Sequence, residues 1–175
     1  DLRGLTAFAA SAEPEAVMAV LGAYHQTVGS IIAEFGATLT SFSGDGVMVL
    51  INAPVPIDDP ALHAVRMAAR LQDDMQVLIA KWRSEGHELG FGIGLAMGVA
   101  IVGRIGYDGR LDYTAIGNTV NLASRLCSSA ENNQVLIDET AAKSIGDRSA
   151  LVPLEGRVLK GYDRELAVFA LRREK

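Results

Sequence analysis

The stretch LDYTAIGNTVNLASRL, residues 111–126, predicts a strand, a glycine turn and a helix in direct succession. We expect Asn118 to cap the first turn of that helix, because asparagine is favoured at this position. Asn121 and Arg125 are four residues apart, so the helix places an amide and a guanidinium on one face. Such a pair can bind a sugar hydroxyl and a phosphate, although an isolated pair is also typical of a solvated helix face. The rest of the chain decides between these interpretations.

The composition indicates one globular domain of 175 residues. Hydrophobic residues make up 49% of the chain and charged residues 21%, which provides enough apolar material to bury a core. The net charge is −5 and the basic residues are scattered, which argues against a nucleic-acid partner held by charge. The single cysteine, Cys127, excludes an internal disulfide and a cysteine metal cluster and suits a reducing compartment. We expect it to pack behind the helix that carries Arg125.

The sequence shows no signal-peptide pattern. Its longest apolar run, residues 91–102, contains three glycines and is too short to span a membrane. We therefore predict a cytoplasmic location and no membrane contact by this segment. Asp1 opens directly into a turn-like segment with no strand before it, which indicates a fragment of a larger protein.

The hydrophobic periodicity alternates between helical and strand spacing along the chain. The glycines of residues 89–105 indicate either a bent hairpin or a close approach of another backbone. Because the strand pairs are mostly hairpins, we predict an α+β fold with a mixed or antiparallel sheet covered by helices. The predicted elements are, in order, a polar loop at 1–6 that offers N–H groups to an anion, a helix at 13–35, a hairpin of strands at 37–42 and 47–52, a helix at 60–83, strand-like residues 89–105, the strand and helix at 111–126, a strand at 134–137, a short helix at 138–145 and closing strands near 151–158 and 165–171.

Three motifs, in this order, resemble the catalytic domain of class III adenylate and guanylate cyclases. They are the opening Asp-Leu-Arg-Gly-Leu-Thr of residues 1–6, the Gly-Asp-Gly turn around Asp45 and the helix of residues 119–126. Leu5 stands where the family usually has phenylalanine. Asp1 and Asp45 are 44 positions apart, as the family pattern requires.

The resemblance covers residues 1–175 and implies a ferredoxin-like βαββαβ core. It also implies a mixed, mainly antiparallel sheet covered by helices, with extra C-terminal strands and a short helix. The family's first strand, which normally precedes the opening aspartate, is then missing upstream of Asp1. An upstream sensor or regulatory domain is implied as well.

The resemblance also assigns roles to individual residues. Asp1 and Asp45 would hold two Mg²⁺ or Mn²⁺ ions per site, since hard cations prefer carboxylate oxygens. Asn121 would orient the ribose, and Arg125 would stabilise charge on the α-phosphate as pyrophosphate leaves. In the family, the aspartates and this helix meet across a head-to-tail dimer, so the resemblance implies a homodimer with composite sites. The expected substrate-binding residues are Leu2, Gly4, Leu5 and Thr6 of the opening segment, Ser41, Thr114, and Lys160 at the terminal phosphates.

The positions that read the base depart from the family pattern. Ser41 and Thr114 stand where adenine-binding members carry lysine and aspartate, and where guanine-binding members carry glutamate and cysteine. Gly92 stands where some members carry a phosphate-binding arginine. Threonine at position 114 also occurs in bacterial adenylate cyclases, which favours ATP over GTP.

Two functional hypotheses follow. The first is an adenylate cyclase that converts ATP to 3′,5′-cyclic AMP and pyrophosphate by two-metal catalysis, with low turnover because the base is loosely held. The alternative is a catalytically weak or inactive module that binds nucleotide or a partner domain. Retention of Asp1, Asp45, Asn121 and Arg125 favours the enzyme. A diguanylate-cyclase-like signalling domain is set aside, because its Gly-Gly-Asp/Glu-Glu-Phe hairpin is missing.

Overall fold

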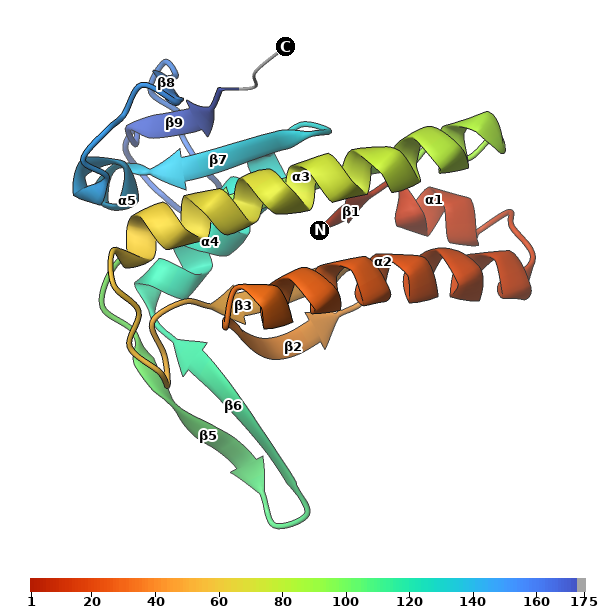
Figure 1. Ribbon diagram of the computed structural model, residues 1–175, viewed down its shortest axis with the longest axis horizontal. Helices are drawn as coiled ribbons and strands as arrows, with labels where there is room; N and C mark the ends of the chain where they lie inside the picture. Colours follow the sequence, from red (N-terminus) through yellow and green to blue (C-terminus); the bar gives the residue numbers. More distant parts are fainter. Residues whose placement is uncertain (173–175) are drawn as a thin grey trace.

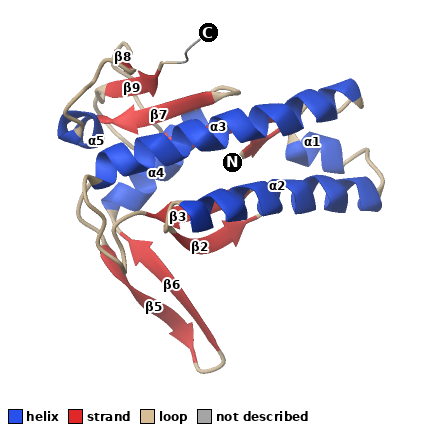
Figure 2. Cartoon of the chain, in the orientation of Figure 1, coloured by secondary structure: helices blue, strands red, loops and turns tan. Residues whose placement is uncertain are grey.

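The computed structural model describes residues 1–172 as a mixed sheet between helices, with two further hairpins (Figure 1, Figure 2). The five-stranded sheet has the order β1-β4-β7-β9-β8, while β2–β3 and β5–β6 form separate two-stranded ladders. The elements are β1 (Leu2–Arg3), α1 (Leu5–Ala9), α2 (Pro14–Glu34), β2 (Thr38–Ser43), β3 (Gly46–Leu50), α3 (Pro60–Ser84), β4 (Gly90–Leu95), β5 (Ile101–Tyr107), β6 (Arg110–Ile116), α4 (Asn118–Ser129), β7 (Gln134–Asp138), α5 (Glu139–Ser144), β8 (Leu151–Pro153) and β9 (Val168–Leu171).

The pairing within the main sheet confirms the predicted α+β class. β4 runs parallel to β7, and the other three neighbouring pairs are antiparallel. One expectation is wrong, since residues 89–105 do not fold back on themselves as a hairpin. β4 lies inside the sheet between β1 and β7, whereas β5 leaves it and pairs with β6.

The opening residues also differ from the expected polar loop. Leu2–Arg3 forms a short strand along β4, and Leu5–Ala9 forms a helix. The side chains of Leu2 and Leu5 are only 2% and 8% exposed. Because these two apolar side chains enter the core, the segment is anchored as regular structure instead of remaining a solvated loop.

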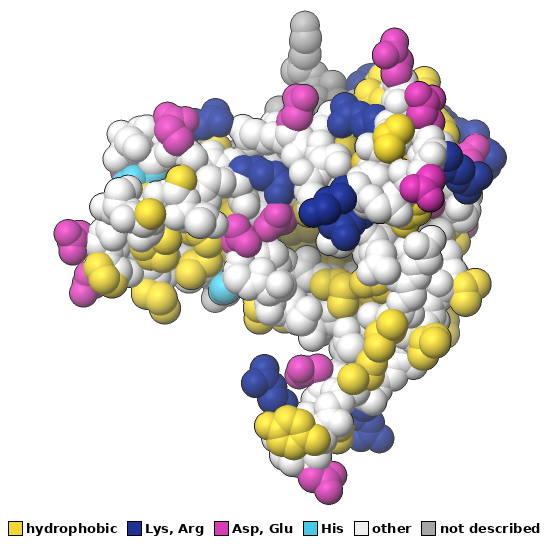
Figure 3. Space-filling view, turned by 180° about the vertical axis from the view of Figure 1, so that it is seen from behind, with side chains coloured by type: hydrophobic (Ala, Val, Ile, Leu, Met, Phe, Trp, Pro, Cys, Tyr) yellow, Lys and Arg dark blue, Asp and Glu magenta, His cyan; other side chains and the backbone are white. Residues whose placement is uncertain are grey.

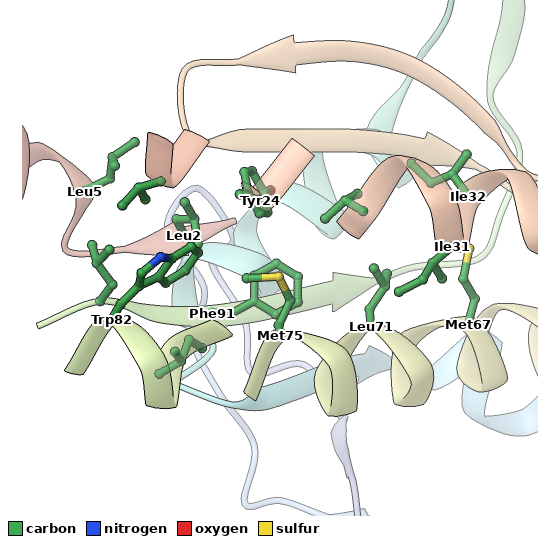
Figure 4. Close-up of a cluster of buried hydrophobic side chains, with 14 residues drawn as sticks. Leu2, Leu5, Tyr24, Ile31, Ile32, Met67, Leu71, Met75, Trp82 and Phe91 are labelled. Carbon is green, nitrogen blue, oxygen red and sulfur yellow. The ribbon is translucent and has the colours of Figure 1, made fainter. Parts of the chain in front are cut away.

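Two long helices cover one face of the sheet, and both were predicted within about a residue. α2 and α3 lie side by side and enclose a core that includes Tyr24, Met75 and Phe91 (Figure 4). Pro60 begins α3 as expected. Asp59, at the capping position, has φ 47° and makes no side-chain capping bond.

By length and composition alone, α2 is the one helix within residues 1–172 that could cross a membrane. The core helix of a folded domain can meet the same criteria. α2 contributes buried side chains to the core with α3, which accounts for its apolar character.

Helix α4 packs on the opposite face of the sheet, against β4 and β7. A Cβ on Gly94 would overlap the carbonyl oxygen of Ala123 and the backbone nitrogen of Cys127. The glycine in β4 therefore allows the close backbone approach that the sequence suggested as one alternative. The expected cap is wrong, since Gly117 precedes the helix and Asn118 is its first residue, with no side-chain capping bond.

The β5–β6 hairpin projects away from the body of the domain (Figure 1). Its apolar side chains Ile101, Ile105, Tyr107, Leu111 and Ile116 are between 41% and 74% exposed. Figure 3 shows apolar side chains along this hairpin and charged side chains at its tip. The hairpin therefore offers an apolar surface that one copy of the chain leaves uncovered.

The C-terminal part follows the prediction with shorter strands. Asp138 caps α5 by accepting hydrogen bonds from the N–H groups of Thr140 and Ala141. β8 and β9 are three and four residues long. Between them, Arg157 and Leu166 form an isolated antiparallel bridge.

Candidate active site

Asp1 and Asp45 lie together where β1 meets the turn between β2 and β3. The N–H of Leu2 donates a hydrogen bond of 3.2 Å to the carbonyl oxygen of Asp45, which joins the two segments. Oδ1 of Asp1 lies 3.5 Å from the position that a Cβ on Gly46 would occupy, so this oxygen faces the turn that carries Asp45. Both aspartates are half-buried.

This pair of carboxylates has the donor chemistry that Mg²⁺ and Mn²⁺ prefer. Across residues 1–172, no group of three or more histidine, cysteine, aspartate or glutamate side chains could hold a metal ion. A cation between Asp1 and Asp45 would therefore take further oxygen ligands from water, backbone or a bound anion. The two residues fit a cation that is shared with a phosphate group.

Arg3 lies against Asp1 and connects it to α4. Its Nη1 is 2.5 Å from Oδ2 of Asp1. Nε donates to the carbonyl oxygen of Ala130 over 3.3 Å, and Nη2 donates to the carbonyl oxygen of Cys127. A Cβ on Gly92 would lie 2.6 Å from Nη2, so the guanidinium fills the space above this glycine.

Tyr24 is a buried phenol within the electrostatic influence of Asp45. Its side chain is 0% exposed, its ring packs edge-on against Phe91, and its hydroxyl has no hydrogen-bond partner among the described residues. Burial, and after it nearby negative charge that includes Asp45, raises the pKa of Tyr24 well above its ordinary value. Tyr24 therefore stays protonated and is unsuited to act as a base.

The α4 face identified from the sequence carries two free polar side chains. Asn121 is exposed and Arg125 is half-buried, and within residues 1–172 neither side chain makes a hydrogen bond or an ion pair. Asp1 is linked through Arg3 to Cys127, which lies about 9 Å along the helix axis from Asn121 at the ordinary helical rise. Arg125 is two residues from Cys127, about 3 Å along the axis, so the Asp1–Arg3 contact lies nearer the Arg125 end of α4 than the Asn121 end.

Ser41 lies on β2 and Thr114 on β6, two strands of separate hairpins that contact each other. Both side chains are half-buried. Ser41 is paired with Met48 next to an irregularity in the β2–β3 register. Thr114 lies opposite Gly103, where a side chain would meet open space. The two positions expected to read the base therefore lie on strands of one chain that contact each other.

Lys160 is exposed on a loop that is fixed at both sides. Leu159 is buried in the core under α4 at 2% exposure. Gly161 has φ 85°, a turn conformation that glycine adopts freely. The hydroxyl of Tyr162 donates a hydrogen bond of 3.1 Å to Oδ1 of Asn118, in the first turn of α4. The loop that carries Lys160 is thereby tied to the first turn of the helix that carries Asn121.

The opening segment carries four of the expected substrate-binding residues, Leu2, Gly4, Leu5 and Thr6. The side chains of Leu2 and Leu5 belong to the core, so only their backbone groups remain for a ligand. Gly4 has φ 80°, and a Cβ on it would lie 2.5 Å from the carbonyl oxygen of Glu88. Gly4 therefore serves the turn between β1 and α1, while the exposed Thr6 keeps a free surface.

The family model for the adenylate and guanylate cyclase catalytic domain matches residues 1–172. The chain belongs to this family. Adenylate cyclase 1 of Rhizobium meliloti is 31% identical over 172 residues, which are 97% of this chain and 26% of that protein. The adenylate cyclase of Anabaena cylindrica is 26% identical over 98% of this chain and 35% of its own length. The cyclase domain thus spans a quarter to a third of these relatives.

Solved structures of cyclases share the fold. The adenylyl cyclase CyaB of P. aeruginosa superposes with a TM-score of 0.88 and 31% identity, covering 100% of this chain and 91% of that one. The guanylyl cyclase Cya2 has a TM-score of 0.83 and 30% identity, covering 98% of this chain and 87% of that one. The domain therefore has the cyclase fold, and of these two similar proteins one is named an adenylyl and the other a guanylyl cyclase.

Two residues that connect the parts of the site in this cyclase domain, Arg3 and Tyr162, were not predicted from the sequence. A signal existed for Arg3, because residues 1 and 3 of an extended segment point to the same face. No local pattern connects Tyr162 with Asn118, which is 44 positions away. That contact depends on the tertiary fold.

Proposed function

We propose that the domain is an adenylate cyclase that converts ATP to 3′,5′-cyclic AMP and pyrophosphate in a head-to-tail homodimer. The observation that carries this proposal is the placement of Asp1, whose Oδ1 faces the turn carrying Asp45. The relatives from Rhizobium meliloti and Anabaena cylindrica are both named adenylate cyclases, which supports ATP as the nucleotide.

In this proposal Asp1 and Asp45 would hold two Mg²⁺ or Mn²⁺ ions. When bound, the ions would supply positive charge to the phosphates and lower the pKa of the ribose 3′-hydroxyl. The 3′-oxygen then forms a bond to the α-phosphorus, its proton passes to solvent, and the bond between the α-phosphorus and the bridging oxygen of pyrophosphate breaks.

The protein side chains contribute binding and charge to this displacement. Asn121 orients the ribose, since an amide can both donate to and accept from a hydroxyl. Arg125 offers fixed donors to the α-phosphate as negative charge develops on it. Lys160 binds the terminal phosphates and stabilises the departing pyrophosphate. None of these three side chains is engaged in an ion pair within residues 1–172, so their donors are available.

The homodimer is supported by the apolar surface of the β5–β6 hairpin. Ile101 and Ile116 face each other across the hairpin and are 74% and 53% exposed. Covering these side chains with a second copy would remove apolar area from water. A second copy would also supply Asn121 and Arg125 to the aspartates of the first.

A weakly active or inactive nucleotide-binding module remains the second candidate. It is favoured by Ser41 and Thr114, whose short hydroxyls replace the charged or fixed base-reading groups of the family. Such a module would bind ATP through the same metals and phosphate contacts without efficient turnover.

Cyclic nucleotide formation by the purified domain tests the proposal. We expect cyclic AMP from ATP with Mn²⁺, and loss of product in Asp45→Ala. The exposed Asp58 precedes α3, away from the site, so Asp58→Ala is a matched control that should keep full activity. Nucleotide binding without product in the unaltered protein would favour the module, and full activity of Asp45→Ala would contradict the two-metal assignment.

A further inference from the structure

We propose that Arg3 is a positioning residue that orients the Asp1 carboxylate for a divalent cation, an inference that rests on the proposed metal role of Asp1 and Asp45. The two oxygens of Asp1 have separate environments. Oδ2 is 2.5 Å from Nη1 of Arg3, whereas Oδ1 faces the turn between β2 and β3. Arg3 thus holds one oxygen and leaves the other directed toward Asp45.

The guanidinium is itself held by the C-terminal end of α4. Its Nε and Nη2 donate to the carbonyl oxygens of Ala130 and Cys127. These carbonyls lie at the negative end of the helix, where a cation is favoured. Three different nitrogens of the guanidinium donate to two carbonyls and a carboxylate, and lysine, with a single nitrogen, cannot reproduce this arrangement.

Gly92 provides the space in which Arg3 lies. A Cβ on Gly92 would be 2.6 Å from Nη2 and 3.2 Å from Cζ of Arg3. The guanidinium therefore occupies the volume that any side chain at position 92 would need. Glycine at position 92 is therefore a condition for the contact between Arg3 and Asp1.

The arrangement favours positioning over competition between Arg3 and the cation. A carboxylate has two oxygens with about four acceptor sites, so one hydrogen-bonded oxygen leaves the other free to ligate. Metal-binding carboxylates are commonly held by such a second hydrogen bond, and removing it typically weakens metal affinity by about 10–100-fold. Arg3 matches this role, since its contact with Asp1 is half-buried, with side chains 25% and 29% exposed.

The test is Mn²⁺ binding, followed by the EPR signal of the free ion, by the purified domain in the presence of 3′-deoxy-ATP, which cannot cyclise. We expect Arg3→Ala to bind Mn²⁺ about 10–100-fold more weakly. Arg3→Lys should bind weakly as well, because it keeps the charge and loses the fork. Gly92→Ala should also weaken binding, because its Cβ displaces a guanidinium that remains present.

A matched control is Arg70→Ala, which removes an exposed arginine paired with Asp74 and Glu34 and should leave Mn²⁺ binding unchanged. Unchanged or tighter binding in folded Arg3→Ala and Gly92→Ala overturns the inference. If Arg3→Ala does not fold, Mn²⁺ binding by Gly92→Ala is the test of the inference. Asp45→Ala in the same assay separates the two proposals. Loss of binding there with normal binding in the Arg3 variants rejects only the role of Arg3, and normal binding in Asp45→Ala rejects the metal site itself.

Discussion

The hydroxyl of Tyr162 lies 3.1 Å from Oδ1 of Asn118, and this hydrogen bond ties the loop that carries Lys160 to the first turn of α4. Tyr162→Phe removes the bond and keeps the ring that packs in the core. We expect the KM for ATP to rise by about 2–10-fold, the range of one ordinary hydrogen bond, with a smaller change in kcat. Steady-state kinetics measure both values.

The same substitution in a Lys160→Ala background is the control. If Tyr162 acts through Lys160, the double variant should be no worse than Lys160→Ala alone. Additive losses would show that Tyr162 affects the site by another route.

Composite sites can be tested by mixing chains. Asp45→Ala lacks one aspartate and Arg125→Ala lacks the guanidinium, so each homodimer should lose activity, by on the order of 10²–10³ for the missing cation. A mixed dimer should contain one site with every group present. We expect activity to recover when the two variants are mixed, as measured by cyclic AMP formation.

Mixing two preparations of Asp45→Ala provides the control and should give no recovery. Absence of recovery in proven mixed dimers would argue against sites shared between the chains.

Base selectivity should be weak in the unaltered protein. The hydroxyls of Ser41 and Thr114 can each donate or accept, so neither purine leaves them unpaired. The double variant Ser41→Lys with Thr114→Asp gives fixed partners to adenine and should raise the ratio of kcat/KM for ATP over GTP. A ratio already above about 10⁴ in the unaltered protein would show that other groups read the base.

The hydroxyl of Tyr24 should contribute little to the free energy of unfolding. Because this buried group has no hydrogen-bond partner among the described residues, Tyr24→Phe should leave the free energy of unfolding at pH 7 unchanged or slightly higher. Denaturant unfolding measures the difference.

The stabilities of the unaltered protein and of Tyr24→Phe should diverge at alkaline pH. The raised pKa keeps Tyr24 protonated in the folded state, while the unfolded chain releases its proton above about pH 10. The unaltered protein should therefore lose up to about 1.4 kcal/mol more stability per pH unit than Tyr24→Phe above that pH. Equal pH profiles would mean that the hydroxyl is accessible to solvent.

The close approach of β4 and α4 predicts a contrast between two glycines. In Gly94→Ala the new Cβ meets backbone atoms of α4, so we expect a loss of at least about 1–3 kcal/mol in unfolding free energy. In Gly29→Ala the methyl group enters open space on α2, and the better helix propensity should stabilise the protein by about 0.5–1 kcal/mol. Equal effects of the two changes would contradict the packing of α4 on β4.

Features that depend on residues close together in the chain could be predicted without the structure. Helical periodicity marked α2 and α3, turn residues marked the β2–β3 hairpin, and a four-residue spacing placed Asn121 and Arg125 on one face. The spacing of motifs also pointed to the family. Each of these patterns involves residues that are near each other in the chain, so each can be recognised without knowing the fold.

The pairing of strands and the contacts between segments distant in the chain became known from the tertiary structure. β4 pairs with β1 and β7 while β5 turns away to β6, a choice that the glycines of residues 89–105 left open. Arg3 reaches Cys127 and Ala130 across more than 120 positions, and its guanidinium requires the glycine at position 92. Such contacts depend on how the layers pack in three dimensions, and local propensity carries no information about them.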